Sequence, residues 1–127
     1  MEYNYPFTEL IGLQTVNQIK EVLLKSNLRD DFTKISHDID TLIQEKDLKL
    51  SARFIRLVIC LAQLDLHIWY CKDQMAEHPD KYTDYLIKAH QINGLRNRIK
   101  NLLSEYAGDS KTHTNDSPDG LEWGISI

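Results

Sequence analysis

Residues that interrupt helices are scarce in this chain of 127 amino acids, which has three prolines and five glycines. Pro6 precedes the first helical pattern, Pro79 separates the last two, and Gly108 follows the last. Between these positions the apolar residues recur at helical spacing, and no strand-like alternation occurs before residue 121. The sequence therefore predicts an all-α protein.

Cysteine is almost as rare. Cys60 and Cys71 fall on one expected helix, about 16 Å apart along its axis, whereas a disulfide needs Cα atoms within about 7 Å. We therefore exclude a disulfide within the chain and expect a reducing, cytoplasmic compartment. His67 and Cys71 are suitable zinc or copper ligands, but Cys60 is too distant to join them. We interpret the cysteines as buried hydrophobic residues and expect no metal and no cofactor.

An excess of positive charge is also missing, because the formal net charge is −4. This argues against broad, sequence-independent binding to nucleic acid, which needs a basic face. The sequence contains no glycine-rich phosphate loop, no HExxH, no CxxC pair and no GxSxG motif. Several common enzyme classes lose support on this ground, and we expect the protein not to be an enzyme.

One long apolar run, FIRLVICLAQLDLHIWYC, covers residues 54–71, and the N-terminus does not resemble a secretion signal. The run is almost long enough to span a bilayer. However, it contains Arg56 and Asp65, each of which costs about 2.5–3.5 kcal/mol near a membrane centre. We therefore expect a buried helix of a soluble bundle and no membrane association.

The apolar spacing predicts helices over residues 8–25, 28–46, 50–76 and 79–106. Thr8 and Asn27 are the expected N-caps of the first two helices. Four helices with short connections pack most simply as an antiparallel four-helix bundle. We assign residues 1–108 to this bundle, with helix 50–76 at its centre, and residues 109–127 to a polar linker and an extended C-terminal tail.

Two parts of the chain carry more apolar surface than one small bundle needs. Helix 8–25 is apolar over more than half of its circumference, which predicts two neighbours or a second subunit and makes Ile11 and Val22 candidate partner-binding residues. The last residues, LEWGISI, alternate between polar and apolar. This tail either folds back onto its own bundle or docks on another chain, as an added strand or by inserting its tryptophan. Its candidate contact residues are Leu121, Trp123, Ile125 and Ile127.

Asp65 lies among apolar residues on its helix, so it needs a partner. The candidates are an Arg or His of a neighbouring helix, or the cluster Arg96, Arg98 and Lys100. We favour a structural ion pair over a catalytic carboxylate with a raised pKa.

The helix 79–106 also carries a polar line opposite its apolar seam. Arg96 and Lys100 flank it, and it includes His90, Asn93 and Asn97. Such a line is a solvent-facing strip, a contact for carboxylates of a protein partner, or a contact for nucleic acid.

These observations favour a non-catalytic protein–protein interaction module, such as an adaptor, inhibitor or accessory subunit, that binds a protein partner and self-associates. The alternative is a nucleic-acid-associated accessory factor that uses a local basic patch of Arg96, Arg98 and Lys100 with Arg53 and Arg56. A third hypothesis is an enzyme built around Asp65 and His67.

Overall fold

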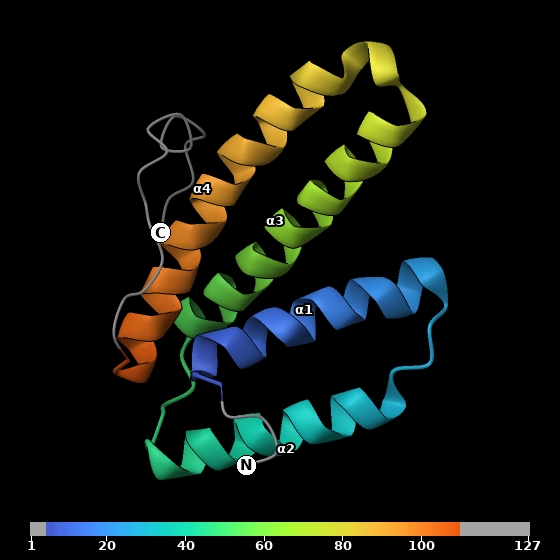
Figure 1. The fold of residues 1–127 in the computed structure, drawn as a ribbon. Coiled ribbons are helices and arrows are strands. Elements are labelled where there is room, and N and C mark those ends of the chain that lie inside the picture. Colours follow the sequence, from blue (N-terminus) through green and yellow to red (C-terminus); the bar gives the residue numbers. More distant parts are fainter. Residues whose placement is uncertain (1–4, 110–127) are drawn as a thin grey trace.

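The computed structural model describes residues 5–109 and folds them into an all-α helical bundle (Figure 1). This confirms the fold class expected from the apolar spacing. Within the described residues there are four α-helices and no strands, and each helix begins and ends within three residues of its expected bounds. The helices are α1 (Phe7–Leu24), α2 (Arg29–Glu45), α3 (Ala52–Glu77) and α4 (Tyr82–Ala107), with a 3₁₀-helix, η1 (Pro79–Lys81), before α4.

The helices of the bundle are arranged in layers. Helices α3 and α4 form a long antiparallel hairpin, α1 crosses the lower half of this hairpin, and α2 lies on the far side of α1 (Figure 1). The backbone of α1 lies close to α2, α3 and α4, whereas α2 lies close to α1 alone among the described helices. The central position therefore belongs to α1. The expectation that the third helix would be central is wrong in this respect.

The hydrophobic core sits where α1 crosses the base of the hairpin. The side chains of Phe7, Leu61 and Leu103 are fully buried there. The ring of Phe54 stacks on that of Tyr106 with centroids 4.6 Å apart, and the ring of Phe7 lies beside both. Each large apolar side chain buried in this way contributes about 1.5–3 kcal/mol, so the base of the hairpin is the best-stabilised part of the fold.

Two helix ends are capped by residues whose chemistry suits the position. The hydroxyl of Ser51 accepts a hydrogen bond from the backbone N–H of Phe54 at 3.0 Å and caps the start of α3. Gly108 ends α4 with a φ of 73°, a left-handed conformation that glycine adopts without a steric penalty.

The two N-caps expected at Thr8 and Asn27 are wrong. Pro6 precedes α1, and Thr8 lies inside that helix, where its buried hydroxyl is 2.9 Å from the hydroxyl of Ser104 on α4. Leu28 occupies the N-cap position of α2, while the side chain of Asn27 accepts a hydrogen bond from the backbone N–H of Arg29. In Thr8 a tertiary contact has replaced the local capping contact.

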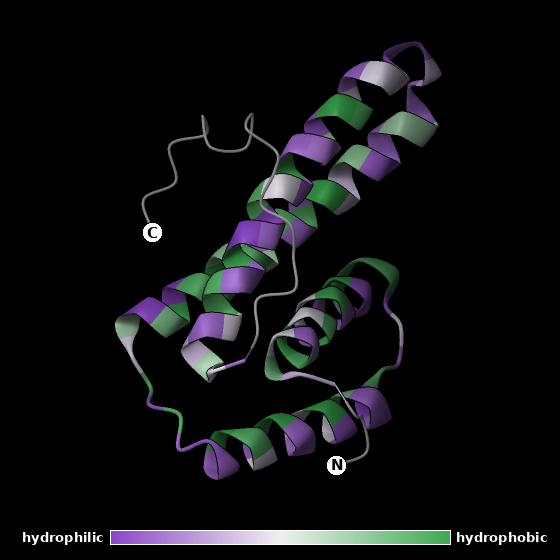
Figure 2. Cartoon of the chain, turned by 60° about the vertical axis from the view of Figure 1, so that its left-hand side comes forward, coloured by the Kyte–Doolittle hydropathy of each residue, from purple (hydrophilic) through white to green (hydrophobic). Residues whose placement is uncertain are grey.

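The far end of the hairpin extends beyond α1 and α2. No residue between Cys71 and Ile92 is buried, so this end consists of two helices that pack only on each other and on the short η1. Figure 2 shows hydrophobic residues in this extension as well as at the base. Leu86 and Ile87 of this extension are exposed, and so is Tyr82. We call residues 72–91 the distal arm.

Candidate protein interaction surface

One side of α3 carries exposed apolar side chains along most of its length. These side chains follow one another at spacings of four, seven and four residues, which places them on one face of the helix. Their exposed fractions lie between 44% and 60%, although α3 also packs against α4 and α1. Large apolar surface of this kind marks interaction sites on soluble proteins. We call this set the α3 face; it comprises Ile55, Ile59, Leu66 and Tyr70.

The α3 face was not predicted from the sequence, because the apolar run over residues 54–71 was expected to form a buried helix. In the structure, 28% of the residues in the most apolar stretch of α3 are buried. By length and composition alone, α3 is apolar enough to cross a membrane. A helical wheel does contain the missing signal, since the four apolar residues are bordered by the polar residues Arg56, Gln63 and His67.

A cleft of about 550 Å³ lies between the end of α1 and the α3 face. It exists because α1 diverges from the hairpin after Ile19, the last buried residue of that helix (Figure 1). Its walls are mainly apolar and include Trp69 and Tyr70. The volume lies within the range of about 300–1,000 Å³ that is typical of pockets holding small ligands. We call it the α1–α3 cleft; it is lined by Leu23, Leu66, His67, Trp69, Tyr70 and Asp73.

The two residues of α1 that we expected to bind a partner have different positions. Val22 is 65% exposed near the end of the helix, next to the exposed Leu23 and Leu24. Ile11 is 6% exposed and belongs to the hydrophobic core. The expectation for Ile11 is therefore wrong, because α2 and the hairpin already cover the apolar side chains in the N-terminal part of α1.

The other partner-binding residues expected from the sequence belong to the C-terminal tail. They lie outside the described residues, so their role stays a prediction. They are Leu121, Trp123, Ile125 and Ile127.

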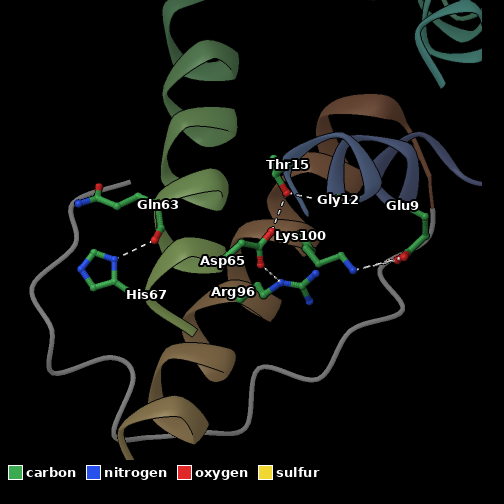
Figure 3. A network of polar contacts seen from close by, with 8 residues as sticks. All are labelled: Glu9, Gly12, Thr15, Gln63, Asp65, His67, Arg96 and Lys100. Atoms are coloured by element: carbon green, nitrogen blue, oxygen red, sulfur yellow. Dashed lines mark hydrogen bonds and ion pairs between the residues drawn. The ribbon is translucent and has the colours of Figure 1, made fainter. Parts of the chain in front are cut away.

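Asp65 connects three helices (Figure 3). Its side chain is buried, and its Oδ1 forms an ion pair with Nε of Arg96 on α4. The hydroxyl of Thr15 on α1 donates a hydrogen bond of 2.6 Å to Oδ2. The partner expected from helix 79–106 is thus Arg96. Both carboxylate oxygens accept hydrogen bonds within the fold, which is the arrangement of a structural ion pair.

Lys100 lies one turn beyond Arg96 and is also engaged. Its ammonium group is 3.1 Å from a carboxylate oxygen of Glu9 on α1, and its side chain is 6% exposed. Figure 3 shows the two cations side by side under α1, each directed at a carboxylate. Two residues of the basic patch considered for nucleic-acid binding, Arg96 and Lys100, are therefore already paired with carboxylates of this chain.

The remaining residues of that polar line carry little positive charge. His90 and Asn93 are exposed, and Asn97 is partly buried, as is Arg98 of the basic cluster. Asn93 and Arg96 share a second cavity of about 300 Å³ with Trp69 of the α1–α3 cleft. This line is thus mainly a polar border of the interface between α1 and the hairpin.

His67 does not approach Asp65. Its Nδ1 is 2.9 Å from the backbone oxygen of Gln63, and the ring points away from the carboxylate network (Figure 3). The structure therefore does not bring together the pair on which the enzyme hypothesis depended.

Both thiols are held in their neutral form. Burial raises the pKa of Cys60, an effect that Arg56 partly opposes. Burial likewise raises the pKa of Cys71, where Lys88 acts in the opposite direction. A neutral thiol is a poor nucleophile and a poor metal ligand. Across residues 5–109, no group of three His, Cys, Asp or Glu side chains is placed to hold a metal ion.

Comparison with known proteins assigns neither a family nor a function to this chain. No family model, curated protein or solved structure matches the chain.

Proposed function

We propose that this chain is a non-catalytic protein–protein interaction module, an adaptor, inhibitor or accessory subunit, that binds a protein through the α3 face and the α1–α3 cleft. One observation carries the proposal: exposed apolar side chains from two helices border an apolar cleft of about 550 Å³. Removing apolar surface from water contributes about 25 cal/mol per Å². A partner that covers this surface therefore gains a substantial driving force.

The composition of the cleft supports a protein as the partner. Trp69 and Tyr70 supply aromatic surface, and tryptophan and tyrosine are enriched among the residues that dominate binding energy at interfaces. His67 and Asp73 add polar groups to the same lining, and a polar rim around an apolar centre is the usual composition of an interface. The partner is expected to present apolar side chains to Trp69.

The location that we propose is the cytoplasm. Cys60 and Cys71 are both free thiols, and free thiols persist in reducing compartments. Their positions along α3 leave no route to a disulfide with each other, since they are separated by about 16 Å of helix.

Affinity capture with matched surface variants tests the function. The full chain is immobilised and exposed to cytoplasmic extract, and retained proteins are identified and then titrated. Leu66→Glu is expected to weaken binding by about thirtyfold, the effect of losing an interface residue worth ~2 kcal/mol. Ile87→Glu is the control, because Ile87 is similarly exposed but lies on the distal arm.

Both variants should keep the helical circular dichroism and melting temperature of the unchanged chain, since both sites are exposed and glutamate is a good helix former. If Leu66→Glu retains every partner at unchanged affinity, the α3 face is not the binding surface and the proposal fails.

A further inference from the structure

Most exposed charges along α3 are separated from one end to the other; the exception is Lys72, which lines the cavity next to Val16 and Ile19 of α1. Arg53 and Arg56 lie in the first turns, and Asp73 and Glu77 lie in the last turns. All four side chains are exposed, and none of them forms an ion pair within residues 5–109. Arg53 lines a pocket with Leu102 and Glu105 of α4. Arg56, Asp73 and Glu77 border the α3 face, which thus runs from a basic residue to an acidic end with its apolar residues between them.

We propose that a second copy of this chain covers the α3 face, with the two α3 helices packed antiparallel. This inference rests on the proposed function, because it names the partner of the same surface. In an antiparallel pair the basic end of each helix meets the acidic end of the other. A parallel pair would place like charges together, which costs interaction energy and disfavours that orientation.

The apolar residues between the charged ends fit such a pairing. A two-fold axis near Ala62 places Ile59 of each copy opposite Leu66 of the other, and Ile55 opposite Tyr70. The same patch then serves both subunits, as an interface with two-fold symmetry requires. The axis falls between Ala62 and Gln63, and the small side chain of Ala62 lets the two helices approach within the usual ~8–10 Å separation.

The charge pattern favours a second copy over a lipid surface. Gln63 borders the α3 face in the middle of the helix, and Asp65 with its ion pair occupies another side there, while Arg56 borders the face in the second turn. A helix in contact with lipid carries charges at the centre of its span only at a cost of about 2.5–3.5 kcal/mol each. In a protein interface the same polar groups form the rim.

The oligomeric state of the full chain tests this inference. Sedimentation and light scattering are expected to give a dimer that dissociates on dilution. Ile59→Glu should yield a folded monomer, and the control Ile87→Glu should remain a dimer. A chain that stays monomeric at about 100 μM, where a micromolar dimer would be assembled, overturns the inference, as does flotation of the protein with phospholipid vesicles.

The two proposals fail separately. A monomeric chain whose capture of another protein is abolished by Leu66→Glu contradicts the dimer and still supports the interaction module. A dimer that Ile59→Glu does not weaken contradicts the assignment of the interface to the α3 face.

Charge reversal tests the antiparallel orientation. Arg56→Glu should weaken dimerisation about fivefold, and so should Asp73→Lys with Glu77→Lys, because exposed ion pairs contribute about 0.2–1 kcal/mol each. The variant with all three changes should regain the original affinity to within about threefold. The reversed charges match the helix dipole, so the monomers should stay folded. Failure of the triple variant to recover overturns the antiparallel arrangement.

Discussion

Asp65 of α3 and Arg96 of α4 form an ion pair that also holds α1, because the hydroxyl of Thr15 on α1 donates a hydrogen bond to the second carboxylate oxygen of Asp65. Asp65 is buried and the side chain of Arg96 is 21% exposed. A charge in this position is stable only while its partner is present. The pair therefore holds α1 in one place against the hairpin.

Asp65→Ala is expected to lower the free energy of unfolding by about 3 kcal/mol, because it leaves the guanidinium of Arg96 without its carboxylate and removes the acceptor of Thr15. Urea denaturation followed by circular dichroism measures this change.

The corresponding double variant is the control. Asp65→Leu with Arg96→Met removes both charges, so it should be less destabilised than Asp65→Ala, since replacing a buried pair with apolar residues is often close to neutral. If the losses of stability measured for Asp65→Leu alone and Arg96→Met alone add up to the loss in the double variant, the two side chains are not coupled and the ion pair does not have the role described.

Ser51→Ala should destabilise the protein by about 1 kcal/mol, because the hydroxyl of Ser51 satisfies the backbone N–H of Phe54 in the first turn of α3. The melting temperature and a urea titration measure it. Ser26→Ala, in the connection between α1 and α2, is the matched control and should change the free energy of unfolding by less than about 0.5 kcal/mol. Equal effects from the two serines would contradict the capping role.

The two thiols predict how stability depends on pH. Their folded pKa values lie above the ordinary value of 9.0 because burial disfavours the thiolate. Below pH 9 both states keep the thiol protons, and the contribution of the thiols to stability is complete. As the pH rises through 9, the unfolded chain loses these protons first, so stability falls until the folded thiols also ionise.

A comparison of urea midpoints between pH 8 and pH 10 measures this effect. The chain carrying Cys60→Ala and Cys71→Ala should lose less stability over that interval than the unchanged chain. Parallel pH profiles for the two proteins would show that the thiols ionise equally in both states.

The helices, and the need of Asp65 for a partner, could be predicted from the sequence for physical reasons. Apolar residues at spacings of three and four identified all four helices, because burial requires that period. Asp65 among apolar residues required a cation from a neighbouring helix, because a buried carboxylate without one is costly. Arg96 is that cation.

The arrangement of the helices could not be predicted in the same way. The periodicity of α1 shows how much of its circumference is apolar, but not which neighbour covers each part, so Ile11 was misassigned to the surface. The pairing of Lys100 with Glu9 joins residues 91 positions apart, and no local pattern marks it. The α3 face was missed because the apolar run was expected to be buried, although the polar residues Arg56, Gln63 and His67 border that face.

The distal arm has a consequence for how the protein opens. Between Cys71 and Ile92 no side chain is buried, so helix hydrogen bonds there lack the packing that protects those at the base. Backbone amides of the arm should exchange with solvent through small local openings, whereas those near Leu61 and Leu103 should exchange only when the whole domain unfolds. Within the same two helices, amide exchange should therefore be slow at the base of the hairpin and fast in the distal arm.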